Sequence, residues 1–110
     1  MGCIFCSIAS GEIPASIVYE DDGIVAFNDI DPKAPVHIIV IPRAHHADID
    51  ALTRADATLA GELLRVAASL GAANLGGFRL VMNTGPDGGQ SVDHVHAHVL
   101  AGRGLGWPPG

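Results

Sequence analysis

Three histidines alternate with small apolar residues near the end of the chain: His94, His96 and His98. Residues two apart in a β-strand share a face of the sheet and lie roughly 6.6 Å apart along it. In a strand, the three imidazoles would therefore project to one side. Val95 and Ala97 would project to the other side, into the core. The pattern predicts a histidine-lined face backed by apolar residues.

Such a face has three interpretations. The strand could simply use histidine as its polar residue. Neutral imidazole is also the commonest metal ligand, although a complete site usually needs ligands from elsewhere in the chain. In the third interpretation, one ring nitrogen attacks as a nucleophile while a neighbouring imidazole donates hydrogen bonds. Three histidines in register, directly after a glycine-rich loop, favour a chemical role over the first interpretation.

The segment before the histidines, residues 87–91, is that glycine-rich loop. Gly88 and Gly89 let backbone N–H groups approach an anion closely, and Ser91 adds a hydroxyl that can donate to a phosphate or to a leaving group. The loop is therefore either an anion cradle or a plain turn, and its position beside the histidines favours the cradle.

Cys3 and Cys6 are the only cysteines of the chain. A pair spaced in this way is a weak signal by itself. It fits half of a metal site, a redox pair, or two buried small hydrophobic residues.

Length and charge narrow the class of protein. A chain of 110 residues suits one domain. The net charge of −6 argues against nucleic acid as the main partner, since phosphate backbones are held chiefly by lysine and arginine. We expect no membrane span, because no apolar run is long enough. Without a basic, apolar start, the chain is expected in the cytoplasm.

The remaining pattern predicts an α+β fold. A helical turn is expected over 3–10, and strands over 17–19, 24–28, 36–41, 78–83 and from Ser91 or Asp93 to Leu100. One long helix is expected from Thr53, where Thr53 and Asp56 have capping-box spacing, to Gly76 and Gly77. Five strands with mostly short connections predict an antiparallel sheet with one long helix and a short N-terminal helix. Residues 104–110 should form an extended tail.

These residues together resemble the histidine triad (HIT) superfamily. Gly88 to Val92, followed by the three alternating histidines, is similar to the superfamily signature, and the likeness covers essentially the whole of residues 1–110 as one HIT domain. The closing Trp107-Pro108-Pro109-Gly110 is similar to the Hint branch, the nucleoside phosphoramidate hydrolases.

The resemblance implies a homodimer that binds a purine nucleoside 5′-monophosphate and its amidates. It implies hydrolysis of a P–N bond or of the mixed anhydride of an acyl-adenylate, through a covalent nucleotidyl-histidine. No metal is required for that chemistry. The alternatives are a non-catalytic dimeric scaffold that binds zinc and nucleotide, and a dinucleoside polyphosphate hydrolase.

The resemblance also implies residue roles. His96 resembles the nucleophile, Ser91 the group that hydrogen-bonds the leaving group, and His37 a supporting histidine behind the triad. The phosphate ligands are expected to be His98 and Asn83, with Gly89 and Gln90 of the loop. Asp29 resembles the acid that binds the ribose hydroxyls. The apolar walls around the base are expected to be Ile4, Phe5, Ile8, Phe27 and Ile30.

Bacterial members of the superfamily with this cysteine pair imply a structural zinc site. Its ligands in this chain would be Cys3, Cys6, His45 and His94, with His46 as the alternative to His45. His94 would then be structural, leaving His96 and His98 for chemistry. Two positions depart from the Hint pattern, Asp93 for an aromatic residue and Ala101 for a glycine, and these departures bear on leaving-group preference.

Overall fold

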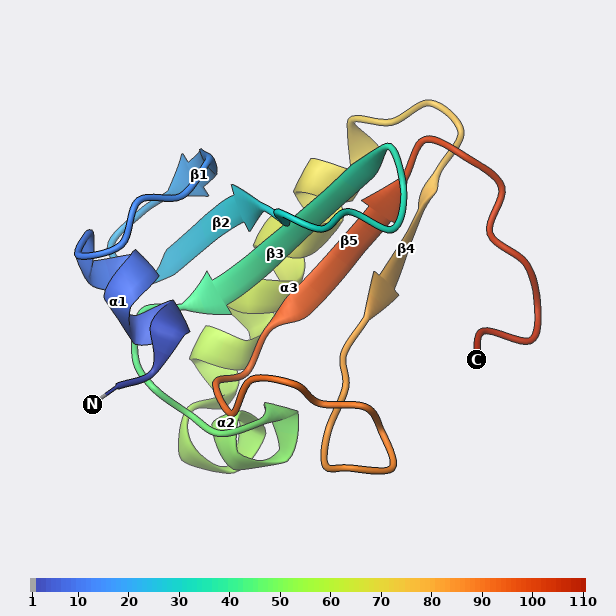
Figure 1. Ribbon diagram of the computed structural model, residues 1–110. Coiled ribbons are helices and arrows are strands. Elements are labelled where there is room, and N and C mark those ends of the chain that lie inside the picture. The colour runs from blue at the N-terminus through green and yellow to red at the C-terminus, as the bar shows by residue number, and fades with distance from the viewer. Residues whose placement is uncertain (1) are drawn as a thin grey trace.

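One five-stranded antiparallel sheet organises the chain in the computed structural model, which describes residues 2–110 (Figure 1). The strands are β1 (Ile17–Glu20), β2 (Ile24–Asn28), β3 (Val36–Pro42), β4 (Phe78–Val81) and β5 (Ala97–Ala101). Their spatial order is β1-β2-β3-β5-β4, and every neighbouring pair is antiparallel. The predicted α+β fold class with five antiparallel strands is confirmed.

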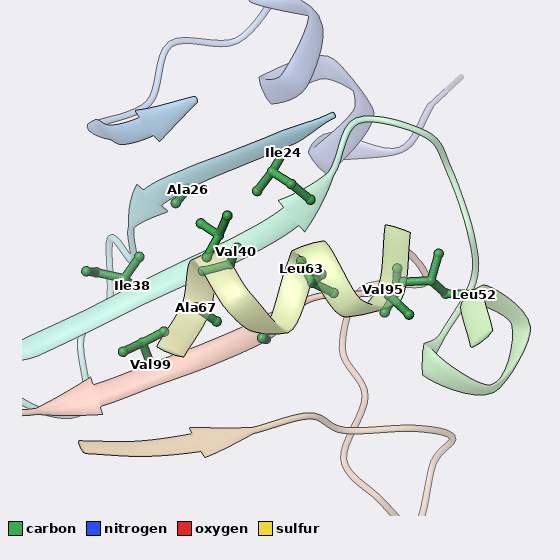
Figure 2. Close-up of a cluster of buried hydrophobic side chains, with 12 residues drawn as sticks. Ile24, Ala26, Ile38, Val40, Leu52, Leu63, Ala67, Val95 and Val99 are labelled. Carbon is green, nitrogen blue, oxygen red and sulfur yellow. The ribbon is translucent and has the colours of Figure 1, made fainter. Parts of the chain in front are cut away.

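Helices cover the two faces of this sheet. They are α1 (Ile4–Ser10), α2 (Ile49–Ala55) and α3 (Ala57–Ala72). Figure 1 shows α3 behind the sheet, and Figure 2 shows Leu63 and Ala67 of α3 turned toward the strands. This face buries a core contributed by both layers: Ile24, Ala26, Ile38, Val40, Leu52, Ala60, Leu63, Val66, Ala67, Val95, Ala97 and Val99.

The opposite face of the sheet carries a smaller cluster under α1. Because side chains alternate along a strand, Val25 and Phe27 of β2 point away from α3. They pack with Phe5 of α1 and with Ile39 and Ile41 of β3. Phe5 is the one buried residue of α1, and Ile8 and Ala9 of the same helix pack partly buried against this cluster.

The predicted long helix is α3, but it begins at Ala57 and not near Thr53. Thr53 lies inside α2, where its hydroxyl donates to the carbonyls of Ile49 and Asp50. The N-caps of α2 and α3 are Asp48 and Asp56, and the capping-box interpretation assigned neither residue as an N-cap. Asp48 accepts a hydrogen bond from Ala51 N at 2.8 Å, and Asp56 from Leu59 N at 3.0 Å. The extended backbone of Asp56, at φ −156° and ψ 83°, separates the two helices. α3 ends at Ala72, before Gly76 and Gly77, where the long helix was predicted to end.

The last strand is shorter than predicted, since β5 begins at Ala97 and not at Ser91 or Asp93. The pairing of β5 with β3 ends at the residues Val40 and Ala97. Pro42 has no N–H to continue it, and its carbonyl accepts a hydrogen bond from the ring of His94. The N–H of Val95 instead donates to His46 O at 2.7 Å. His94 and His96 therefore lie on a connecting segment, and His98 lies in the strand. On the neighbouring edge, β4 ends at Val81, two residues before the predicted Asn83.

The C-terminal residues run along the edge of the sheet beside β4 (Figure 1). Arg79 of β4 holds them by donating to Leu105 O at 3.1 Å and to Gly106 O at 2.7 Å. Trp107 is 84% exposed. Among residues 2–110, no helix has the length and apolar character needed to cross a membrane.

Candidate functional site

A cavity of about 300 Å³ opens between α1, the end of β2 and the histidine segment. This volume is at the small end of the range for ligand sites. Nine of the residues singled out in the sequence line it: Ile4, Phe5, Ile8, Phe27, Asp29, Ile30, Ser91, His96 and His98. Its walls are thus mainly aliphatic and aromatic, with polar groups gathered at one end. That arrangement suits a ligand with an apolar body and a polar terminus.

His94 is turned away from this cavity and is fully buried. Its Nε2 lies 2.8 Å from Pro42 O, and because a carbonyl only accepts, Nε2 carries the hydrogen. In the neutral ring the lone pair is then on Nδ1, which lies 3.3 Å from the Sγ of Cys3 and 3.5 Å from that of Cys6. Burial lowers the pKa of His94 and so favours the neutral ring.

His96 has the opposite tautomer. Its Nδ1 lies 2.8 Å from the carbonyl oxygen of His94, so Nδ1 carries the hydrogen. In the neutral ring the lone pair is on Nε2. The ring lines the cavity and is 4% exposed. It packs edge-on against Phe5 and against His98, with 5.0 Å between ring centroids in each case. Backbone and ring contacts thus fix both the orientation and the tautomer of His96.

His98 is fixed by a chain of hydrogen bonds that starts at the backbone. Lys33 N donates to His37 Nδ1 at 3.0 Å, so the hydrogen of neutral His37 is on Nε2. That group donates to His98 Nδ1 at 2.9 Å, which leaves the hydrogen of His98 on its own Nε2. Burial, with the neighbouring His96 and His37, lowers the pKa of His98 to about 4. Near neutral pH, His98 is therefore an uncharged donor.

His37 lies behind His98 and does not line the cavity. It is 6% exposed, and burial lowers its pKa while the carboxylate of Asp29 opposes the shift. Asp29 Oδ2 lies 3.3 Å from His37 Nε2, and its Oδ1 accepts from Asp31 N at 2.9 Å. Asp29 thus lines the cavity with a carboxylate already oriented by the turn that follows β2.

The glycine-rich loop is held by side chains that the sequence suggested as phosphate ligands. Gln90 accepts from Gly85 N at 3.0 Å and donates to Ala47 O at 2.6 Å and Val92 O at 3.0 Å. Asn83 donates to Gly88 O at 2.7 Å. Gln90, Asn83 and Gly89 do not line the cavity, whereas Ser91 does. In this structure the two amide side chains shape the loop.

A second cluster lies at the N-terminus of α1. The Sγ atoms of Cys3 and Cys6 and the Nδ1 atoms of His45 and His94 gather within 4.8 Å of one another. Cys6 Sγ lies 3.3 Å from His45 Nδ1. Two sulfurs and two nitrogens are a tetrahedral zinc set, whose S–N edges are roughly 3.6 Å. The ring nitrogen that His94 presents is its unprotonated one, as a ligand must be. The residues therefore fit zinc. His46, the alternative ligand, is not in the cluster.

Sequence reasoning missed part of the cavity lining: Ile13, Pro14, Ala15, Asn28, Ile39 and Val92. Ile13 to Ala15 follow α1 in a segment without regular structure, and the sequence there shows only a turn. Ile39 reads as an ordinary residue of a buried strand. No spacing or residue type marks either group as part of a site, because their role depends on how α1 folds back over the sheet.

Comparison with known proteins places these features in a family context. The family model described as HIT domain matches residues 10–105. A HIT family hydrolase of known crystal structure from Legionella pneumophila Philadelphia 1 is 46% identical with a TM-score of 0.94, and the match covers 99% of this chain and 100% of that one. The 14 kDa zinc-binding protein of Brassica juncea is 46% identical over 113 residues, covering 97% of this chain and 98% of that protein. Adenylylsulfatase HINT1 of Arabidopsis thaliana is 45% identical over 114 residues, covering 97% and 76% respectively.

Proposed function

Because this chain belongs to the HIT domain family, we propose that it is a hydrolase of purine nucleoside 5′-phosphoramidates or acyl-adenylates that releases the nucleoside monophosphate. One observation carries the proposal: the unprotonated Nε2 of His96 and the N–H of neutral His98 belong to adjacent rings that line the same cavity. The Legionella neighbour is called a hydrolase and the Arabidopsis relative an adenylylsulfatase, which supports hydrolysis at an adenylyl group.

In the proposed reaction, His96 Nε2 attacks the α-phosphorus. The new N–P bond forms as the bond from phosphorus to the leaving amine or acyl oxygen breaks. Ser91 hydrogen-bonds that leaving group, and an amine takes up a proton from solvent as it departs. His98 donates to a phosphate oxygen. Water then attacks the nucleotidyl-histidine, releases the monophosphate and returns the lone pair to His96. The covalent intermediate divides one difficult displacement into two easier ones. Asp29 accepts from the ribose hydroxyls, and the apolar walls hold the base.

Charge favours substrates with a single phosphate. Within residues 2–110, no lysine or arginine side chain lines the cavity. Each further phosphate of a dinucleoside polyphosphate would bring negative charge to a place without a cation, where its desolvation is not compensated. Hydrolysis of amidates and acyl-adenylates is therefore favoured over hydrolysis of dinucleoside polyphosphates.

The direct test compares the wild-type protein with His96→Ala on adenosine 5′-phosphoramidate. We expect kcat to fall on the order of a thousandfold or more. Acid quenching of the wild-type reaction should trap a nucleotidyl adduct on His96. His46→Ala is the matched control, since His46 lies outside the cavity and the metal cluster. Equal turnover by wild type and His96→Ala would remove His96 from its role.

Two further substrates separate the alternatives. Faster hydrolysis of a diadenosine polyphosphate than of the phosphoramidate would favour the polyphosphate hydrolase. Tight AMP binding with no turnover of either substrate would favour the non-catalytic scaffold.

We also propose structural zinc at Cys3, Cys6, His45 and His94, where the ion would stabilise the N-terminal region. The zinc-binding relative supports this assignment. Phosphorus chemistry remains with His96 and His98.

We propose a homodimer as well. Within residues 2–110, β4 pairs on one side only, with β5, and Phe78 at its start is 40% exposed. A strand edge of this kind is suited to pairing with a second chain. Sedimentation equilibrium should give twice the mass of the chain, and a monomer at micromolar concentration would contradict this part of the proposal.

A further inference from the structure

The wall of the nucleotide cavity formed by residues 8–15 has hollow space on both sides. Ile8, Ile13, Pro14 and Ala15 line the candidate nucleotide cavity. The same four residues also line a second hollow of about 350 Å³. This second hollow lies toward β1, and its other lining residues include Ile17, Glu20 and Arg43. Ile8 and Ala15 pack partly buried against the cluster around Phe5, but the space on both sides leaves the wall less closely packed than a protein interior.

The backbone hydrogen bonds of this segment reach no further than Ile17, the first residue of β1. Gly11 N donates to Ile8 O, Ile13 N to Ser7 O, and Ile17 N to Ala15 O. Each of these contacts joins residues close together in the chain. An isolated helix as short as the seven residues of α1 is also marginal in water. The position of the wall must therefore be set by contacts with other elements.

Arg43 supplies such a contact at the C-terminal end of α1. Its Nη1 donates to Ala9 O at 2.7 Å, and this carbonyl is one of those that a helix leaves without an internal partner. The same guanidinium donates from Nε to Asp21 O at 2.8 Å and from Nη2 to Glu20 Oε1 at 3.0 Å. Within residues 2–110, the bond from Arg43 to Ala9 is the only hydrogen bond that joins residues 8–15 to a segment beyond residue 17.

Arg43 is itself well anchored. It directly follows β3, and its backbone N–H donates to Gly23 O at 2.8 Å. The planar guanidinium has donors in a fixed fork, so one side chain can hold three acceptors in a defined relation to one another. The end of α1 is therefore tied to the β1–β2 turn and to the end of β3 through a single residue.

We propose that Arg43 is a positioning residue for the nucleotide cavity. By holding Ala9 O, it keeps α1 and residues 11–15 in the position where Ile8 and Ile13 line the cavity. The inference rests on the proposed function for the identity of the ligand. Arg43 does not touch the ligand, and its effect is on the pre-organisation of the wall.

The test compares Arg43→Ala with wild type in AMP binding by calorimetry and in turnover of adenosine 5′-phosphoramidate. We expect the AMP Kd and the KM to rise about tenfold, which is about 1.4 kcal/mol, while kcat stays within about twofold. Arg54→Ala is the matched control, because Arg54 is an exposed residue of α2 paired with Asp50. Zinc content should be the same in all three proteins. An unchanged AMP Kd, or a loss confined to kcat, would overturn the inference.

Hydrogen exchange provides a readout that needs no ligand. The amides of Gly11 and Ile13 should exchange faster in Arg43→Ala than in wild type, and equal rates would refute the inference. If Arg43→Ala does not fold, Arg43→Lys carries the same test, since one ammonium cannot hold all three acceptors. A wild-type protein that does not bind AMP would refute the proposed function, and the exchange rates would still decide the role of Arg43.

Discussion

Lowering the pH from about 7.5 to about 5 should destabilise this protein through His98 in a way that the variant His98→Gln does not share. The pKa of His98 is about 4 in the folded protein, against an ordinary value of 6.5. Between these two values the unfolded chain binds more protons at this position than the folded chain. The stabilisation is thus fully present above about pH 6.5 and is lost as the pH falls toward about 4.

The size of the effect follows from the same two pKa values. At about pH 5, the linkage relation gives a loss of about 2 kcal/mol in the free energy of unfolding, relative to neutral pH. The ring of His98 is partly exposed, and solvent screening reduces this figure to about 1 kcal/mol. For a domain of this size, that corresponds to a decrease of about 1 M in the urea midpoint.

Urea unfolding of wild type and His98→Gln across this pH range measures the effect. The residues outside the His37–His98 contact are the same in both proteins, so the difference between the two pH slopes reports on His98 and the rings that touch it. Titration of the His98 ring by NMR gives its pKa directly. The reasoning is refuted if the two slopes coincide, or if His98 titrates near its ordinary value of 6.5.

Three other changes probe the loop, the helix cap and the metal cluster. In Gly88→Ala the new Cβ would collide with the backbone carbonyl of Thr84. AMP affinity measured by calorimetry should therefore fall about tenfold or more. The control is Gly61→Ala, whose new Cβ meets open space, and this variant should bind AMP as wild type does. Asp56→Ala removes the N-cap of α3 and should lower the free energy of unfolding by about 1 kcal/mol in urea titrations, and an unchanged midpoint would contradict the capping role. Cys6→Ser should lose zinc in metal analysis, and a chelator should lower the Tm of wild type but not of Cys6→Ser.

The sequence predicted the sheet better than the helices. Runs of β-branched residues such as Val36–Ile41 identify strands by themselves. The break at Asp56 could not be predicted in this way, because the apolar periodicity continues through it and Thr53 offers a second plausible cap. The late start of β5 depends on Pro42 and His46, which lie about fifty residues away in the chain. Local pattern carries no information about such a contact.

The candidate site was likewise predictable where local pattern decides the structure, and not where residues distant in the chain decide it. The alternation of the three histidines predicted that Val95 and Ala97 turn into the core and that His96 and His98 face the same cavity. It did not predict that the ring of His94 turns away from that cavity, toward Cys3 and Cys6. The different tautomers of the histidines were not predictable, because each is fixed by a partner distant in sequence or by a backbone carbonyl. The meeting of Cys3 with His94 was suggested only by the family resemblance.

The absence of cations from the cavity lining, noted above for residues 2–110, has a kinetic consequence. The whole chain carries a net charge of −6, so an approaching nucleotide anion meets repulsion at long range with no local attraction to focus it. Added salt screens such repulsion over a Debye length of about 8 Å at physiological ionic strength. If the ligand is the proposed nucleotide, we therefore expect its capture to accelerate as salt is added, the reverse of a site that attracts its ligand with arginine and lysine. In the proposed reaction, the same repulsion would assist release of the monophosphate and favour turnover over retention of product.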